Sequence, residues 1–380
     1  MNWPKARLGE VMRLAHEAHP VEPGRTYPNL GIYSFGRGVF AKPPIDAATT
    51  SATTLYKVKA GQLIYSRLFA FEGAYTTVPE EFDGAFVSNE FPTFSVRPDR
   101  ALPGYLGWLF RWPETWRLLR LKSVGLGDRR QRIHPERLLE HEAPLPPLEE
   151  QKRIVARLDA AASALAKRRA AADAVAAEMS STLRSAFARI VADAPRARMG
   201  DIAPLVRRAV TIDAEALYSE IGVRSFYRGL FTRRTVKGEE FDWQKLFEVR
   251  SGDLVFSNLM AWEQAIGLAD TLHNGSVGNH RMLTCEVDSR RASPDFLFYY
   301  FTTEEGFRQI VGASPGTMVR NKTLSTRLLP GITVPTPSLD TQHWFDQLQA
   351  KCAAARAAQR NSEFELSRLL PAMLHDAFGG

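Results

Sequence analysis

The chain contains one unit twice, and this duplication constrains its fold more than any other feature. Residues 7–187 return as residues 198–378 at a constant offset of 191 positions, without a gap. The segment 31–35 (GIYSF), for example, returns as 222–226 (GVRSF). Two copies of one unit in one polypeptide predict a pseudo-dimer, a form that suits a target with two halves, as DNA-binding dimers show.

Composition limits the class of protein. The chain has 380 residues, of which 44% are hydrophobic and 10% aromatic, and this predicts a folded protein with two or more domains. No apolar run reaches the length of a membrane span, and the first residues lack the apolar segment of a signal peptide, so we expect no membrane association and a cytoplasmic location. Cys285 and Cys352 are the only cysteines, and no Cys/His cluster has zinc-ligand spacing, which predicts no metal site. Cys352 lies in an Ala-rich helical run and is expected to be a small buried thiol.

The net charge of +7 is compatible with a polyanionic partner. Phosphate contacts supply much of the affinity of proteins for nucleic acid. Charge alone is weak evidence, however, because many cytoplasmic proteins of this length are mildly basic.

The first part of each copy mixes short strands with Gly/Pro turns. Period-two runs predict strands at 63–65, 91–96 and 282–287. Amphipathic spacing predicts one helix in each copy, at 106–121 and at 296–311. The first of these carries three tryptophans four residues apart, which favours core packing over base stacking: Trp108, Trp112 and Trp116.

The second part of each copy is a long helix. Residues 148–190 contain no Gly or Pro, and apolar residues alternate at spacings of four and three, as in a heptad seam. A similar stripe follows residue 338 and extends to Met373. A lone helix with such a stripe is unstable in water, so we expect the two helices to pair, and the chain order predicts that they pair antiparallel.

These patterns predict an α+β fold with a pseudo-twofold internal repeat. We expect two tandem α/β domains separated by two long antiparallel coiled-coil helices. The expected boundaries are domain 1 at 1–147, a central helix at 148–192, domain 2 at 193–337 and a C-terminal helix at 338–380. A helix of about 38 residues spans roughly 57 Å, longer than one turn of B-DNA at roughly 34 Å. The pattern by itself leaves open a helical protein–protein scaffold that binds no nucleic acid.

One motif favours a nucleic-acid function. Residues 144–155 (PLPPLEEQKRIV) strongly resemble the conserved segment of specificity subunits of type I restriction-modification systems, in which a proline-rich turn leads into Glu-Gln and a long helix. The second copy, 334–342 (VPTPSLDTQ), keeps the prolines and Gln but loses the preceding Glu. The strand segment 58–67 and the Gly-Thr turn at 316–322 are also similar to this family, although both copies carry an aromatic–Glu pair where the family often has a Gly-rich turn.

The resemblance implies two target-recognition domains that each read one half of a bipartite double-stranded DNA site. It also implies that the helices set the gap and dock methyltransferase (modification) subunits, with a restriction (translocase/nuclease) subunit as a further partner. S-adenosylmethionine is expected on the methyltransferase, and no cofactor on this chain. An S-like subunit of another methylation-based phage-defence system or of a type II system is an alternative that the sequence hardly separates.

Base reading requires side chains with paired donors or acceptors, such as Arg for guanine and Asn or Gln for adenine. The first candidate set lies on a Gly-bearing loop at the same place in both copies: Arg129, Arg130, Gln131 and Arg132, with Arg320, Asn321 and Lys322. The residues differ between the copies, as expected of domains that read different half-sites. The alternative is a solvated basic loop that contacts only phosphates or nothing.

Further candidates lie elsewhere in both copies. A second set follows equivalent strands: Ser66, Arg67, Ser257 and Asn258. A third set precedes the next predicted strands: Ser88, Asn89 and Glu90, with Asn279, His280 and Arg281. Arg37 and Arg228 match after Ser-Phe, which predicts a shared role in phosphate binding or in a structural ion pair.

A catalytic function is poorly supported by the sequence. It lacks the Asn-Pro-Pro-aromatic motif and the Gly-rich S-adenosylmethionine loop of a methyltransferase, as well as a phosphate-binding loop for ATP hydrolysis. Glu72 and Glu263 are acids at equivalent positions, for which we expect a structural role. We therefore expect a recognition subunit that performs no chemistry itself.

Overall fold

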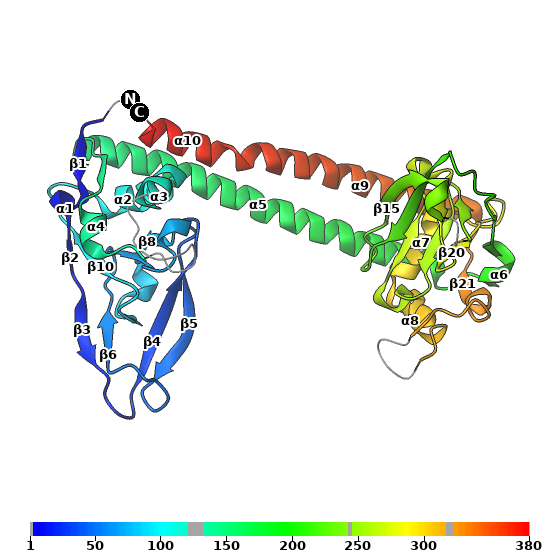
Figure 1. Ribbon diagram of the computed structural model, residues 1–380, viewed down its shortest axis with the longest axis horizontal. Helices are drawn as coiled ribbons and strands as arrows, with labels where there is room; N and C mark the ends of the chain where they lie inside the picture. The colour runs from blue at the N-terminus through cyan, green and yellow to red at the C-terminus, as the bar shows by residue number, and fades with distance from the viewer. Residues whose placement is uncertain (1–2, 121–131, 242–244, 317–321, 380) are drawn as a thin grey trace. The chain divides into compact units, whose positions relative to one another are not determined.

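The computed structural model describes residues 3–120, 132–241, 245–316 and 322–379 (Figure 1). It divides into two compact units, called unit 1 (Met1–Asp173 with Gln359–Gly380) and unit 2 (Ala174–Ala358). Each unit contains the mixed helices and sheets of one copy of the repeat. The predicted α+β class and the tandem repeat are therefore confirmed.

The globular part of unit 1 contains three sheets. Their strand orders are β1-β11, β2-β10-β7-β8 and β3-β6-β9-β4-β5. The strands are β1 (Lys5–Arg7), β2 (Met12–Leu14), β3 (Glu17–Pro20), β4 (Thr26–Ile32), β5 (Val39–Asp46), β6 (Thr54–Lys57), β7 (Leu63–Tyr65), β8 (Tyr75–Thr77), β9 (Phe86–Val87), β10 (Thr93–Val96) and β11 (Glu142–Pro144). The helices are α1 (Leu8–Val11), α2 (Pro103–Leu109), α3 (Pro113–Arg120) and α4 (Pro135–Leu139), with the 3₁₀ turns η1 (Ala70–Glu72) and η2 (Glu80–Phe82).

Unit 2 has the sheets β12-β21, β13-β20-β17-β18 and β15-β14-β19-β16. They repeat the arrangement of unit 1 except that the segment equivalent to β3 forms only an isolated bridge, between Ala209 and Phe247. The strands are β12 (Arg196–Arg198), β13 (Leu205–Val206), β14 (Leu217–Val223), β15 (Leu230–Lys237), β16 (Phe247–Val249), β17 (Leu254–Ser257), β18 (Ile266–Leu268), β19 (Ser276–Gly278), β20 (Met282–Cys285) and β21 (Thr333–Pro335). The helices are α6 (Met199–Ile202), α7 (Pro294–Thr302) and α8 (Glu304–Gly312), with the 3₁₀ turns η3 (Gly238–Phe241), η4 (Ala261–Glu263), η5 (Thr271–His273) and η7 (Leu329–Gly331).

The offset of 191 holds for the elements as well as for the residues. β4 and β14, β5 and β15, η1 and η4, and β8 and β18 each begin and end at equivalent residues. Each copy has one parallel strand pair, β4 with β9 and β14 with β19, among antiparallel neighbours. The predicted strands at 63–65, 91–96 and 282–287 are confirmed, the last two in shortened form.

The two expected amphipathic helices are wrong as single elements, because each is a pair of short helices. In unit 1 the break precedes Pro113, which has no N–H to bond the previous turn and whose ring clashes with it. In unit 2 Thr303 is extended and its hydroxyl accepts a hydrogen bond from the Gly306 amide at 3.2 Å, so it ends α7 and caps α8. Trp108 therefore lies on α2, Trp112 in the turn between the helices and Trp116 on α3. Trp108 is buried, and Trp112 and Trp116 pack against the unit 1 core, as expected.

The long helices are α5 (Leu148–Val191), α9 (Leu339–Ser367) and α10 (Leu369–Phe378). They run antiparallel within each unit. In unit 1 Arg157 pairs with Asp376 at 2.9 Å and Arg168 bonds Ser362 at 2.9 Å. In unit 2 Arg356 bonds Ser180 at 2.7 Å, and the ring centroids of Phe187 and Phe345 lie 5.3 Å apart. In both units partner numbers fall on one helix as they rise on the other, which confirms the antiparallel prediction.

The predicted C-terminal stripe is wrong at Leu369, whereas its last residue, Met373, packs against the unit 1 core. The helix is interrupted between Ser367 and Leu369, because Pro371 cannot donate to the Ser367 carbonyl. As a result Leu369 is exposed, and Leu374 and Phe378 are buried instead. Cys352 is only partly buried against the unit 2 core.

A glutamine in the proline-rich motif joins each long helix to its globular part. Gln151 is fully buried and its side-chain oxygen accepts from the Leu102 amide at 2.9 Å. Its amide nitrogen donates to the carbonyls of Arg100 (3.1 Å) and Pro146 (2.8 Å). Gln342 makes the same contacts in unit 2, accepting from the Ser293 amide at 2.8 Å. This explains why the motif retains Gln in both copies.

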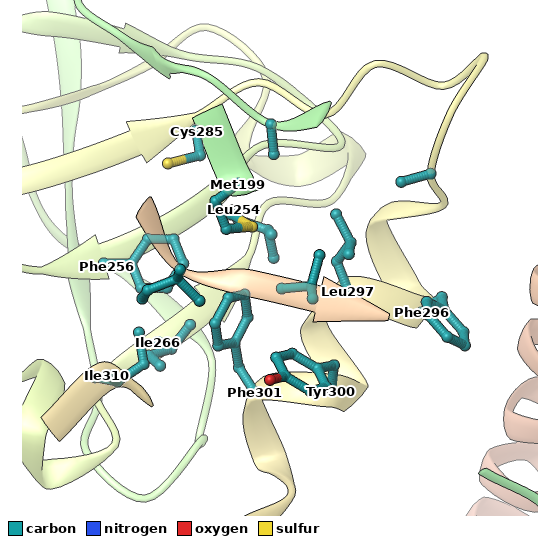
Figure 2. Close-up of a cluster of buried hydrophobic side chains, with 14 of the residues drawn as sticks. Met199, Leu254, Phe256, Ile266, Cys285, Phe296, Leu297, Tyr300, Phe301 and Ile310 are labelled. Carbon is teal, nitrogen blue, oxygen red and sulfur yellow. The ribbon is translucent and has the colours of Figure 1, made fainter. Parts of the chain in front are cut away.

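The largest core of unit 2 lies between its sheet β13-β20-β17-β18 and the helices α7 and α8 (Figure 2). Phe256 and Leu254 from β17 meet Phe301 from α7 in this core. The Cys285 thiol lies there too, and burial raises its pKa to about 12, so it behaves as a small apolar side chain.

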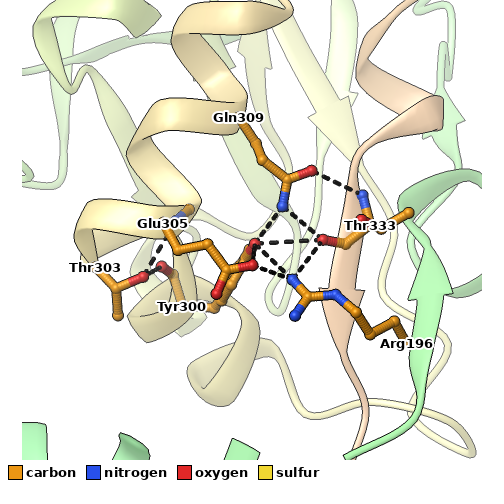
Figure 3. Close-up of polar contacts among 7 residues, drawn as sticks. Arg196, Tyr300, Thr303, Glu305, Gln309 and Thr333 are labelled. Carbon is orange, nitrogen blue, oxygen red and sulfur yellow. Dashed lines mark hydrogen bonds and ion pairs between the residues drawn. The ribbon is translucent and has the colours of Figure 1, made fainter. Parts of the chain in front are cut away.

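A polar network fastens β12 and β21 to α7 and α8 (Figure 3). The Thr333 carbonyl accepts hydrogen bonds from Gln309 (2.7 Å), Tyr300 (3.3 Å) and Arg196 (3.3 Å). Arg196 also pairs with Glu305. Burial raises the pKa of Tyr300 to about 12, so the phenol stays protonated and donates. The network is structural.

Candidate nucleic-acid interface

Three segments that are distant in the sequence meet at the exit of strand β7 in unit 1. The Arg67 amide donates to the Glu90 carbonyl at 2.9 Å, and the Ile133 amide donates to the Arg67 carbonyl at 3.3 Å. Side chains join the same segments, since Arg132 pairs with Glu90 at 3.2 Å and Arg67 contacts His134 at 3.0 Å. Members of all three candidate sets therefore lie together.

Unit 2 repeats this backbone frame with different side chains. The Asn258 amide donates to the Arg281 carbonyl at 2.8 Å, and the Leu324 amide donates to the Asn258 carbonyl at 2.8 Å. The Asn258 side chain donates a further bond to the Leu324 carbonyl at 2.8 Å. We call each cluster an exit surface. It comprises residues 66–67, 88–90 and 132–134 in unit 1, and residues 257–258, 279–281 and 322–324 in unit 2.

The candidate side chains differ in how freely they face solvent. Asn89, His280 and Arg281 are exposed, and Lys322 is half-exposed. Ser66 and Ser257 are buried, and the Ser66 hydroxyl accepts a hydrogen bond from the Phe69 amide at 3.3 Å, so it supports the turn. Arg129, Arg130, Gln131, Arg320 and Asn321 lie outside the described residues.

The Arg67 side chain is partly buried and lies close to His16. Its Nε is buried and has no hydrogen-bond partner among the described residues. Burial and the nearby Arg67 charge lower the pKa of His16, whose ring stacks on Tyr56. The neutral form of the His16 imidazole is therefore favoured near the Arg67 guanidinium.

In unit 2 a buried carboxylate orients the exit surface. Glu220 is almost fully buried on β14 and accepts from Arg234 Nε at 2.8 Å and from Asn279 Nδ2 at 3.3 Å. The Asn279 oxygen in turn accepts from the Arg281 amide at 2.9 Å. Unit 1 has Asn29 in place of Glu220, so this support exists in only one copy.

A hairpin tip lies next to each exit surface. The tips are residues 34–38, between β4 and β5, and residues 225–229, between β14 and β15. Arg37 donates to the Ser34 carbonyl at 3.0 Å and lies over the ring of Tyr33 at 5.2 Å, while Arg228 lies 5.8 Å from the ring of Phe226. Neither contact is an ion pair.

The matched acids hold these tips in place. Glu72 accepts from the Ser34 hydroxyl at 3.0 Å, and Glu263 accepts from the Ser225 hydroxyl at 3.4 Å. The structural role expected for both acids is confirmed. Phe35 and Phe226, which follow these serines, were not among the candidates predicted from the sequence. The Ser-Phe pair repeated in both copies could have identified them.

The described residues contain no group of three or more His, Cys, Asp or Glu placed to hold a metal ion. Within the same ranges, no helix is long and apolar enough to span a bilayer.

Comparisons with known proteins agree with this architecture. No protein-family model matches the chain, and no curated protein matches it. The HsdS subunit from Thermoanaerobacter tengcongensis superposes with a TM-score of 0.59 at 22% identity, covering 100% of this chain and 97% of that chain. A chain in a structure described as the basis of complex assembly and conformational transition of the type I R-M system gives a TM-score of 0.70 at 21% identity, covering 99% of this chain and 97% of that chain. The protein thus has the fold of the S subunits of type I restriction-modification systems.

Proposed function

We propose that the chain is the specificity subunit of a type I restriction-modification complex, a non-catalytic DNA reader that acts in the cytoplasm. Each unit reads one half of a bipartite duplex, and the long helices set the gap between the halves. Methyltransferase subunits and a restriction subunit are its partners, with S-adenosylmethionine bound by the methyltransferase.

The observation that carries this proposal is the repeated exit surface. The same backbone hydrogen bonds present Arg67 in unit 1 and Asn258 in unit 2 at equivalent positions. A fixed frame with variable donors suits two domains that read different base sequences, because Arg favours guanine and Asn favours adenine. Exposed cations such as Arg281 add phosphate contacts.

The helices offer surfaces for the protein partners. Trp344 and Phe364 on α9 are 48% and 65% exposed. Aromatic side chains are enriched in the centres of protein interfaces. We propose that the methyltransferase subunits cover them.

The test is selection of bound duplexes from a random pool by the chain co-expressed with its neighbouring methyltransferase. A two-part motif with a fixed unspecified gap is expected. Enrichment of no sequence by an intact complex would refute the reader and favour the helical scaffold. An S-like subunit of another methylation-based system is distinguished by which enzymes copurify.

Equivalent substitutions assign each unit to its half-site. Asn89 and His280 occupy the same position in the two copies and are both exposed. Asn89→Ala is expected to relax or weaken one half-site and His280→Ala the other. Replacing Arg129–Arg132 with Ala should likewise affect only the half-site of unit 1. Equal damage to both half-sites from any of these changes contradicts the assignment.

A further inference from the structure

Each hairpin tip presents a phenylalanine in an unfavourable backbone conformation. Phe35 is 60% exposed with φ of 64°, and Phe226 is 64% exposed with φ of 60°. Left-handed backbone is disfavoured for residues with a Cβ, and hairpin turns that need it normally use Gly, Asn or Asp. The Phe35 ring has one aromatic neighbour, Trp116, with ring centroids 6.1 Å apart. Most of the surface of both phenylalanines is nevertheless left to solvent.

The surrounding structure fixes this conformation in both copies. The Phe35 amide donates to the Glu72 carbonyl at 2.7 Å, and the Phe226 amide donates to the Glu263 carbonyl at 3.1 Å. The next residue donates to the equivalent turn in each unit, at 2.9 Å from both Gly36 and Tyr227. The ring is therefore presented on a rigid support.

A single turn lies between each tip and its exit surface. The turn that receives the tip ends beside Ala74, whose carbonyl accepts from the Ser66 amide at 3.0 Å. In unit 2 the Ser257 amide donates to the Ala265 carbonyl at 3.0 Å in the same way. One hydrogen-bonded turn thus connects each phenylalanine to the side chains proposed to read bases.

The charge next to each ring suits a polyanion. Arg37 and Arg228 are exposed and lie 5.9 Å and 5.8 Å from the rings of Phe35 and Phe226. The carboxylates at the tips accept hydrogen bonds from Ser34 and Ser225 and so are engaged within the chain. An apolar ring next to a guanidinium is complementary to DNA, because the ring can contact a base step while the guanidinium contacts the phosphate beside it.

We propose that Phe35 and Phe226 are apolar wedges that insert between adjacent bases, one in each half-site, while Arg37 and Arg228 contact the flanking phosphates. The proposal rests on the proposed DNA-reading function and adds deformation of the duplex to it. Inserted Phe, Leu, Ile or Met side chains partly unstack a base step and kink the duplex. Such insertion makes recognition depend on how easily a step unstacks, beyond its hydrogen bonds.

The experiment uses the complex with its methyltransferase and the bipartite duplex found by selection, with 2-aminopurine placed at successive positions of each half-site. Binding is expected to raise fluorescence at one step per half-site. Phe35→Ala should abolish the rise in one half-site and Phe226→Ala in the other, each weakening binding about 10- to 100-fold, the range for loss of one stacked base. Leu369→Ala and Leu272→Ala, which remove exposed apolar side chains elsewhere in units 1 and 2, should leave both signals unchanged.

The possible outcomes distinguish the wedge proposal from the proposed DNA-reading function. If the complex without any substitution binds no duplex, the DNA-reading function is refuted, and the wedge proposal with it. Tight binding with a fluorescence rise that survives both substitutions refutes only the wedge. Loss of the methyltransferase from the complex of either variant identifies the ring as a protein contact and also overturns the wedge. Phe226→Gly is a control for misfolding, because Gly adopts the left-handed backbone without strain. The unfolding temperature of this variant should equal or exceed that of the parent, while its DNA affinity should still fall.

Discussion

Replacing Gln151 with Met tests whether one buried amide holds unit 1 to its long helix. Methionine has nearly the same length but cannot replace the bonds to the Leu102 amide and to the Arg100 and Pro146 carbonyls. Three backbone groups then lose their partner in a site where the Gln151 side chain is fully buried. At about 1–1.5 kcal/mol for each hydrogen bond, the expected loss of stability is about 3–5 kcal/mol.

The loss should be confined to unit 1. In thermal unfolding, the transition of unit 1 is expected to fall by roughly 10 °C, since about 2–4 °C is lost per kcal/mol for domains of this size. Hydrogen exchange should accelerate at the Leu102 amide and not at the equivalent Ser293 amide of unit 2, which bonds Gln342. Gln342→Met should produce the mirror-image result.

A matched control is Gln359→Met on α9, because the single hydrogen bond of the Gln359 side chain to a described residue is to Glu363, one turn further along the same helix, at 3.2 Å. This substitution is expected to lower the free energy of unfolding by less than about 0.5 kcal/mol. A cost for Gln151→Met of less than about 1 kcal/mol, or an unchanged exchange rate at the Leu102 amide, would show that the motif does not act through these bonds.

Three further predictions address pH, a buried ion pair and target spacing. Burial and Arg67 lower the pKa of His16 below its usual 6.5, so the folded chain binds this proton less well than the unfolded chain. Unit 1 should therefore lose stability as the pH falls below about 6.5. In unfolding curves at pH 5 and 7.5, His16→Gln should reduce that loss. If the parent and His16→Gln lose the same stability between the two pH values, His16 is not the group responsible. Arg208→Met should cost about 3–5 kcal/mol in chemical unfolding, because it leaves the Asp253 carboxylate, only 3% exposed and 2.6 Å from Arg208, without its cation. Adding Asp253→Gln, the residue type of the first copy, should recover most of that loss, and failure to recover would mean that the charge is not the cause. Lengthening both long helices by about one turn (~5.4 Å) should widen the gap in selected DNA sites by one or two base pairs of roughly 3.4 Å each, and an unchanged gap would reject the helices as a ruler.

Much of the fold was predictable because its signals are local. The offset of 191 predicted two equivalent domains, and the Pro-rich turns followed by uninterrupted helical periodicity predicted where α5 and α9 begin. The errors occurred where one residue overrides periodicity. Pro113 divides a helix that the tryptophan spacing makes continuous, and Pro371 ends the apolar stripe early.

The sequence by itself determined the repeat, the fold class, the resemblance to specificity subunits and the residue types available for reading bases. Only the tertiary structure decided which of them meet. Arg67, Glu90 and Arg132 come together because β7 lies between β10 and β8 in the sheet, so segments tens of residues apart end at one point. The exposure and strain of Phe35 likewise depend on hydrogen bonds to a turn that follows a different strand. Periodicity reports only which face of an element is buried, whereas the order of strands in a sheet is set by long-range pairing that no local pattern encodes.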